Sequence, residues 1–154
     1  MSTFPEIINI ESVLPHRGRM RLVEQVLTYD ADSVAVALQV PADGLFHKGN
    51  GVPAYVGIEY MAQAVACWAG AMARLQGRPQ PLGFLLGSRR YQAEVPMFAC
   101  GSHLRIEARR ELMGDNGLGV FACRILDEQG QLLASANVSV FEPPDAAAYL
   151  EQEA

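Results

Sequence analysis

The chain has only three cysteines and three histidines, and neither set has the spacing of a metal site. Cys67, Cys100 and Cys123 contain no CxxC pair, and their odd number argues against a disulfide framework. The histidines are scattered, without an HxxxH or HExxH pattern. The sequence therefore predicts no metal site, core positions for all three thiols, and a reducing, cytoplasmic compartment.

Positive charge is also scarce. Lys and Arg together number 12 against 17 Asp and Glu, which gives a formal net charge of −5, and Lys48 is the single lysine. This balance argues against nucleic acid as the main partner and against a polybasic membrane patch. The arginines do cluster at residues 17–21, 89–90 and 105–110. Solvated strand faces are the simpler interpretation, and docking of an acidic partner is the alternative.

An uninterrupted transmembrane run is missing as well. The most apolar stretch, Val52 to Ala73, approaches the required length, but Glu59 and Gln63 interrupt it and segments of alternating hydrophobicity surround it. A buried core helix is the better interpretation. The first residues carry neither a basic segment nor an apolar one, so no secretory signal is expected, and no phosphate-binding GxxxxGK loop is present.

At 154 residues the chain is most simply one α+β domain covering residues 1–154. Pro53 favours a helix start, and Gly77 followed by Pro79 ends a helix that runs to about residue 74–76. Alternating hydrophobicity predicts strands elsewhere. The expected strands cover residues 20–28, 33–40, 82–95, 103–112, 118–127 and 132–141, with short helices at 4–14 and 145–154. The expected architecture is one sheet wrapped around one long helix.

Glu59 is a carboxylate on an otherwise apolar helix, which requires a reason because burying a charge is costly. It is either a general acid or a structural glutamate satisfied by Gln63, one turn later, or by a tyrosine hydroxyl. His47 lies twelve residues upstream in a glycine-rich loop and is either a general base or a solvated loop residue. Unpaired N–H groups at the helix start, near Ala54 and Tyr55, would hold a carbonyl oxygen while negative charge builds on it.

The case for a functional role is weaker for the two other histidines. His16 lies in a turn and either lines the mouth of a pocket or serves only that turn. His103 falls on the wet face of a predicted strand, which explains it without a site. Together, a base, an acid and oxyanion donors suit proton abstraction next to a thioester carbonyl.

Three segments carry a resemblance to a known family, and they occur in the family's order. Leu14-Pro-His-Arg-Gly-Arg-Met-Arg-Leu-Val-Glu-Gln-Val26, Leu45-Phe-His47 and Val52-Pro-Ala-Tyr-Val-Gly-Ile-Glu-Tyr-Met-Ala-Gln63 resemble the 3-hydroxyacyl-acyl carrier protein dehydratases of the FabZ/FabA kind. The likeness extends over residues 14–141. The last of the three segments is similar to a divergent branch linked to aryl-polyene and related polyketide-like pathways.

The resemblance implies a hot-dog fold that works as a homodimer or as a heterodimer with a related hot-dog subunit. His47 would remove the C2 proton, and Glu59 of the opposite subunit would protonate the departing C3 hydroxyl. The Ala54 N–H would polarise the thioester carbonyl, Gln63 would orient Glu59, and His16 and Tyr55 are candidate pocket residues. No cofactor is implied, since the acyl group arrives on the phosphopantetheine arm of an acyl carrier protein that an arginine cluster would dock.

The chain departs from the family pattern in the loop between His47 and Pro53, which is two residues shorter, and in Ala54, which replaces a glycine. Two alternatives remain open at this point. In a hot-dog thioesterase the helix carboxylate would activate water, and in a non-catalytic partner subunit the same apolar space would only bind acyl chains.

Overall fold

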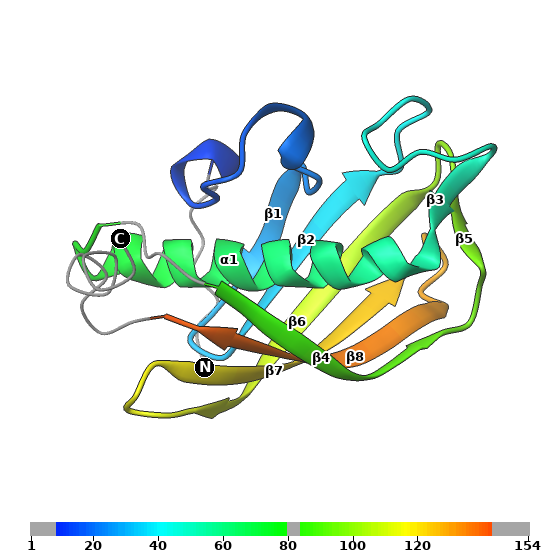
Figure 1. The fold of residues 1–154 in the computed structure, drawn as a ribbon. Coiled ribbons are helices and arrows are strands. Elements are labelled where there is room, and N and C mark those ends of the chain that lie inside the picture. The colour runs from blue at the N-terminus through cyan, green and yellow to red at the C-terminus, as the bar shows by residue number, and fades with distance from the viewer. Residues whose placement is uncertain (1–8, 80–83, 143–154) are drawn as a thin grey trace, which may run out of the picture.

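The computed structural model describes residues 9–79 and 84–142, and its main feature is a six-stranded antiparallel sheet curved around one helix (Figure 1). The helix, α1 (Gly57–Leu75), packs against all six strands. In spatial order the strands are β1 (Gln25–Tyr29), β2 (Ser33–Gln39), β6 (His103–Met113), β7 (Leu118–Leu126), β8 (Leu132–Phe141) and β4 (Phe84–Ala93). This α+β arrangement is the hot-dog fold, so the predicted fold is confirmed.

Two very short strands were not predicted. β3 (Gly51–Pro53) pairs antiparallel with β5 (Met97–Ala99), within segments that the sequence assigns to a loop and a turn. Three residues are too few for an alternating pattern, and both segments adjoin a proline. This pair fixes the point at which the chain enters the helix.

The long helix begins later than its proline suggests. Pro53 keeps extended backbone angles (φ −56°, ψ 143°), and the first helical turn, η3 (Ala54–Val56), is a 3₁₀ turn. The Ala54 N–H donates to the Pro96 carbonyl at 3.0 Å, which continues the β3–β5 pairing by one residue. The α-helix proper therefore starts at Gly57, so Glu59 is its third residue and not the seventh, as a start at Pro53 would make it.

Alternation in the strands predicts the buried face correctly. In β6 the side chains of Leu104, Ile106 and Ala108 are buried, and the neighbouring positions are more exposed. Aromatic contacts link helix and sheet: the Trp68 and Phe121 rings lie 5.3 Å apart, edge to face. The core thus fills the space between α1 and the concave side of the sheet.

The cysteine prediction is right at two positions of three. Cys67 and Cys123 are buried, and burial raises the pKa of each thiol to about 12. Cys100, however, is only half-buried, because it lies in the turn after β5 rather than on a strand face that meets the helix.

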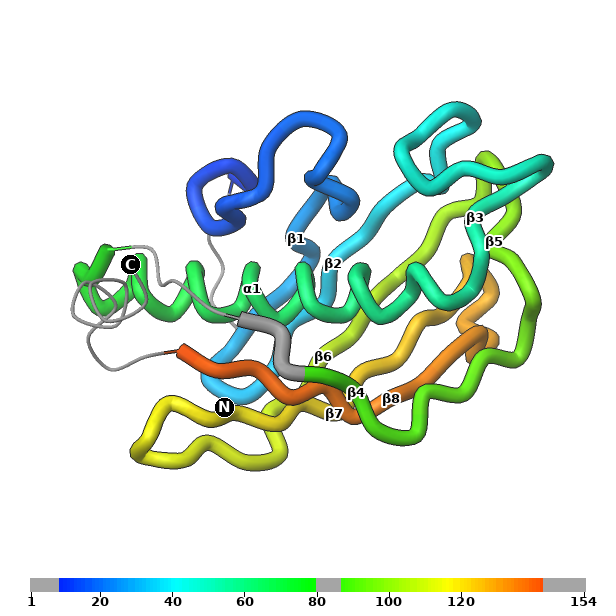
Figure 2. The backbone as a smooth tube through the Cα atoms, viewed as in Figure 1, coloured from blue at the N-terminus to red at the C-terminus, as the bar shows by residue number. Residues whose placement is uncertain are grey.

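The segment before β1 contains two 3₁₀ turns, η1 (Ile10–Ser12) and η2 (Gly18–Met20). The helix predicted at 4–14 is thus a single short turn where it is described, and its first residues, like the predicted tail helix at 145–154, lie outside the described residues. The strand predicted from Met20 begins only at Gln25. Figure 2 shows this segment and the 41–50 loop along the same edge of the molecule, above α1.

Several of the clustered arginines are already paired. Arg105 and Arg124 both bind Glu107, at 2.9 and 2.5 Å, and Arg110 binds Asp32 at 2.8 Å. Partial burial would raise the pKa of Glu107, but its two guanidinium partners outweigh this and hold the pKa below its usual range. These arginines therefore belong to the solvated sheet face, as the simpler interpretation states. Among the described helices, none is long and apolar enough to span a membrane.

Candidate active site

Glu59 is the centre of the candidate site, and it is held through one of its two oxygens. Its Oε1 accepts a hydrogen bond from Gln63 Nε2 at 3.3 Å and lies 3.8 Å from His16 Nε2. Within the described residues, Oε2 has no hydrogen-bond or ion-pair partner. The side chain is 36% exposed, so in a single chain the carboxylate is not deeply buried. One oxygen positions the group and the other is free for chemistry.

Gln63 supports this carboxylate from a fully buried position. Its Oε1 accepts from the backbone N–H groups of Leu22 and Val23, at 2.8 and 3.3 Å. Its Nε2 donates to the Met20 carbonyl at 2.7 Å and to Glu59. Because the two backbone N–H groups require the oxygen on their side, the amide nitrogen must face Glu59. Gln63 thus orients Glu59 and also ties the chain before β1 to the helix.

Gln63→Leu is expected to lower stability by about 3 kcal/mol, because it leaves two backbone N–H groups and one carbonyl unsatisfied next to the core. Chemical denaturation measures this loss. Gln92→Leu, at an exposed position on β4, is the matched control and should change stability little. Equal effects of the two substitutions would contradict the role of the Gln63 bonds.

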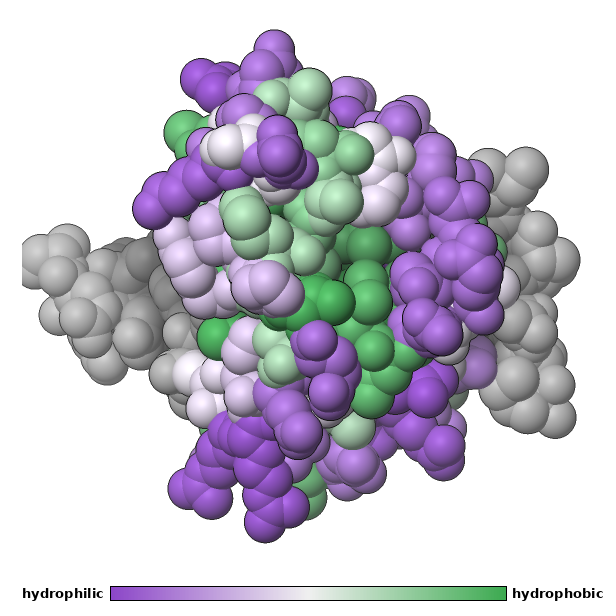
Figure 3. All heavy atoms as spheres, turned by 90° about the vertical axis from the view of Figure 1, so that its right-hand side faces the viewer, coloured by the Kyte–Doolittle hydropathy of each residue, from purple (hydrophilic) through white to green (hydrophobic). Residues whose placement is uncertain are grey.

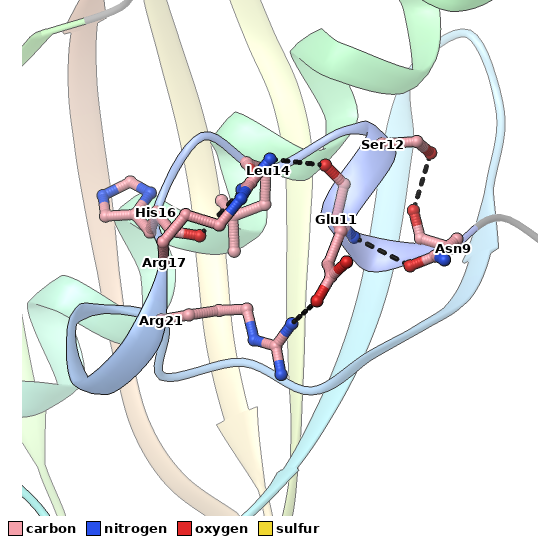
Figure 4. A network of polar contacts seen from close by, with 7 residues as sticks. All are labelled: Asn9, Glu11, Ser12, Leu14, His16, Arg17 and Arg21. Atoms are coloured by element: carbon pink, nitrogen blue, oxygen red, sulfur yellow. Dashed lines mark hydrogen bonds and ion pairs between the residues drawn. The ribbon is translucent and has the colours of Figure 1, made fainter.

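His16 is the histidine that the structure brings next to Glu59. It is held by a network in which Arg17 donates to the carbonyls of Leu14, His16 and Glu11, the last two at 2.9 Å (Figure 4). Its Nδ1 is sealed from solvent and has no partner among the described residues. A proton on Nδ1 would have no acceptor, whereas a proton on Nε2 points toward Glu59. This geometry favours the Nε2-protonated tautomer of the neutral ring.

His47 is not brought to Glu59 within one chain. Its side chain is half-buried and makes no hydrogen bond or ion pair to any described residue. The shortened loop that follows closes as a tight turn, with Lys48 N–H donating to Gly51 O at 2.8 Å and Gly51 N–H to Lys48 O at 3.2 Å. Gly49, at φ +58°, supplies the left-handed backbone that this turn needs.

The backbone N–H and the backbone carbonyl of Ala54 both have hydrogen-bond partners. Its N–H donates to the Pro96 carbonyl, and its own carbonyl accepts from the Tyr91 hydroxyl. As an oxyanion donor, Ala54 would have to exchange Pro96 for a substrate oxygen. The Tyr91 contact was not foreseen, since nothing in the local sequence distinguishes this tyrosine. Gly57 leaves room for the Tyr91 hydroxyl, because any larger residue would place a Cβ 2.3 Å from its oxygen.

A cleft of about 390 Å³ opens in front of Glu59. Glu59 is the one carboxylate among its lining residues, which otherwise are Met20, Phe46, Tyr55, Val56 and Ile58. Tyr55 is 63% exposed. Figure 3 views the end of the molecule with β3, β5 and the helix start, and shows hydrophobic surface in the middle of that face with hydrophilic side chains around it. An apolar cleft strengthens electrostatic effects on a reacting group.

Across residues 9–79 and 84–142, no three His, Cys, Asp or Glu side chains lie together as metal ligands would. The candidate site holds a positioned carboxylate in an apolar cleft, with one histidine beside it.

Comparison with known proteins identifies the family. The sequence model of the ApeP dehydratase family matches residues 8–151, which is nearly the whole chain. The chain belongs to the ApeP-like dehydratase family. Because dehydratases are hydro-lyases, the family also gives the chain its enzyme class. A search of curated proteins finds no match to this sequence.

Among solved structures, a chain of the dehydratase heterocomplex ApeI:P from Xenorhabdus doucetiae is similar to this ApeP-like chain, with 28% identity and a TM-score of 0.85. The match covers 96% of this chain and 98% of that one. The PaaI protein of E. coli is 17% identical over 75% of this chain and 80% of that one, with a TM-score of 0.59.

A hypothetical thioesterase bound to coenzyme A, from Streptococcus pneumoniae TIGR4, is 13% identical over 77% of this chain and 84% of that one, with a TM-score of 0.61. At such identities, the likeness to this structure and to PaaI shows only that the fold is shared. The predicted link to the dehydratases therefore rests on the family match.

Proposed function

We propose that this chain is a subunit of a dehydratase that converts 3-hydroxyacyl thioesters, carried on an acyl carrier protein, to trans-2-enoyl thioesters in an aryl-polyene-like pathway. The observation that carries the proposal is Glu59, with one oxygen held by Gln63 and near His16, and the other without a partner among the described residues, in an apolar cleft. A general acid for a leaving hydroxyl needs this arrangement, because its proton must point at the substrate.

The reaction requires a base as well as an acid. The base removes the C2 proton, the electrons of that C–H bond form the C2–C3 double bond, and the C3–O bond breaks. Glu59 gives its proton to the departing hydroxyl, which leaves as water, and the proton held by the base later restores the acid. Negative charge that builds on the thioester oxygen would be stabilised by N–H groups at the helix start.

The base is His47, acting between two subunits. Among the described residues of its own chain, the His47 side chain has no hydrogen-bonding partner, which fits a residue that completes a site on a neighbouring chain. The structure similar to this one is described as a heterocomplex, and we propose likewise that this chain pairs with a related hot-dog subunit. Glu59 would then face a histidine of the partner.

The carrier protein would dock near the apolar cleft. Arg19 and Arg21 border a groove next to it, and their guanidinium groups would meet the acidic surface of the carrier. The phosphopantetheine arm would bring the substrate, so no resident cofactor is needed.

One assay tests the proposed reaction. The purified protein, alone and with the partner subunit that co-purifies with it, is incubated with a 3-hydroxyacyl carrier-protein thioester. Enoyl formation and release of free thiol are then followed together. Enoyl product supports the dehydratase. Thiol without enoyl product would show a thioesterase, and neither product would show a subunit that only binds acyl chains.

His47→Ala is expected to reduce enoyl formation roughly a thousandfold, because removing a general base costs about two to four powers of ten. His16→Ala should cost only about tenfold, since His16 acts on Glu59 and not on the substrate. His103→Ala, on the exposed face of β6, is the control and should have no effect. A greater loss in His16→Ala than in His47→Ala would assign the base to the same chain as Glu59.

A further inference from the structure

A second hollow lies beside the cleft of Glu59. It is a groove of about 530 Å³ between the segment that enters β1, the loop before His47, and α1. Its apolar lining includes Leu22, Phe46 and Val52, and charged side chains border it. Phe46 lines both the groove and the cleft, so the two spaces are neighbours. For an acyl chain that reacts at Glu59, this groove is therefore a neighbouring space for its far end.

Tyr60 belongs to the lining of this groove and is only 2% exposed. Its ring packs against Phe98, with ring centroids 5.7 Å apart. Its hydroxyl has no hydrogen-bond partner among the described residues. Among the described residues, His16 Nδ1 is the one side-chain nitrogen or oxygen that is both sealed from solvent and without a partner. The Tyr60 hydroxyl is therefore not sealed and keeps access to open space. Because Tyr60 lines the groove and its hydroxyl is not sealed, that hydroxyl is available to a molecule that fills the groove.

Tyr91 differs from Tyr60 in the hydrogen bonding of its hydroxyl. Both tyrosines lie in the same region, and burial raises the pKa of each to about 12. The Tyr91 hydroxyl, however, is used by the fold, since it donates to the Ala54 carbonyl. The Tyr60 hydroxyl is equally proton-bearing at neutral pH, but it forms no hydrogen bond to a described residue. A phenylalanine would fill the same volume without an unpaired polar group.

We propose that Tyr60 is a specificity residue: its hydroxyl hydrogen-bonds an oxygen on the distal part of the acyl group, which lies in the groove beyond Phe46. The inference rests on the proposed function, because it assumes that an acyl thioester occupies the cleft. It predicts that the substrate class is acyl chains with a polar oxygen, in preference to plain alkyl chains. A site built to hydrogen-bond such an oxygen discriminates against the analogue without it.

The test uses unreactive pantetheine amides as probes. One carries an octanoyl chain, and the others carry the same chain with a carbonyl near its middle or near its end. The wild-type protein, with its partner subunit if they co-purify, is expected to bind one carbonyl probe about tenfold more tightly than the octanoyl probe in calorimetry. In Tyr60→Phe this preference should disappear while the affinity for the octanoyl probe is kept.

Thermal unfolding separates this role from a structural one. Tyr60→Phe should not lower the Tm, because the Tyr60 hydroxyl forms no hydrogen bond to a described residue. Tyr91→Phe should lower the Tm and keep the preference for the carbonyl probe. A crystal structure of the wild type with the preferred probe should bring the probe oxygen within hydrogen-bond distance of Tyr60, which tests the proposal without any variant.

The proposal is overturned if the wild type prefers the octanoyl probe or has no preference, or if the preference survives in Tyr60→Phe. It stands if the protein binds these probes as expected but forms no enoyl product, and in that case only the proposed dehydration fails.

Discussion

Glu59→Gln is expected to reduce enoyl formation roughly a thousandfold while the protein stays folded, because a carboxamide keeps the shape of the side chain but has no acidic proton to give. The amide oxygen can still accept from Gln63, so the position of the side chain is kept. Steady-state rates on a 3-hydroxyacyl carrier-protein thioester measure the effect. Because the loss concerns the transition state, it should fall on kcat more than on KM.

The control for this substitution is Glu111→Gln, which removes an exposed carboxylate from β6 and should leave the rate unchanged. Stability provides a second readout. Catalytic groups are often kept at a cost in stability, so Glu59→Gln should be at least as stable as the wild type. Near-normal turnover of Glu59→Gln would remove Glu59 from the reaction and with it the basis of the proposed mechanism.

Gly70→Ala is expected to destabilise the protein by about 3 kcal/mol, or roughly 10 °C in Tm, because α1 and the N-terminal segment touch at this glycine. An added Cβ would lie 2.0 Å from the carbonyl oxygen of Val13 and 2.7 Å from its carbonyl carbon. These are backbone atoms of a fully buried residue, so a rotamer change cannot relieve the clash. Differential scanning calorimetry measures the shift.

The same substitution should also reduce activity. Val13 lies three residues before His16, and the turn between them is held by Arg17, so moving Val13 moves His16 relative to Glu59. Gly87→Ala on β4 is the control, since a Cβ there meets nothing within 4 Å. If Gly70→Ala were no more harmful than Gly87→Ala, the N-terminal segment could not pack on α1 as described.

Much of the fold follows from local pattern. The long strands were predicted to within a few residues, because buried positions alternate with more exposed ones in strands such as β6 and β8, and this two-residue alternation is visible in the sequence. The helix was predicted from its apolar composition and its closing Gly77. β3 and β5 were missed because a three-residue strand has no pattern of its own, and the pairing of Gly51 with Ala99 spans distant parts of the chain.

The candidate site was less predictable. Glu59 and Gln63 were paired correctly, because residues one helical turn apart always share a face. The bonds from Gln63 to Met20, Leu22 and Val23 join segments about forty residues apart, and no spacing rule relates them. For the same reason, the proximity of His16 to Glu59 could not be read from sequence, although its turn had been noted. The occupied Ala54 N–H depends on Pro96, which is equally remote in the chain.

Four features follow from the amino-acid sequence alone: the scarcity of metal-ligand patterns, the alternating strands, the long helix, and the placement of one carboxylate and one amide on the same face of that helix. These are local properties, set by residue type and by the period of helix or strand. Tertiary packing places His16 rather than His47 next to Glu59 in one chain and brings Gln63 to the entry of β1. It also places the Tyr60 hydroxyl beside a groove, without a hydrogen bond to any described residue. Each of these depends on contacts between segments far apart in the sequence, which packing around α1 brings together.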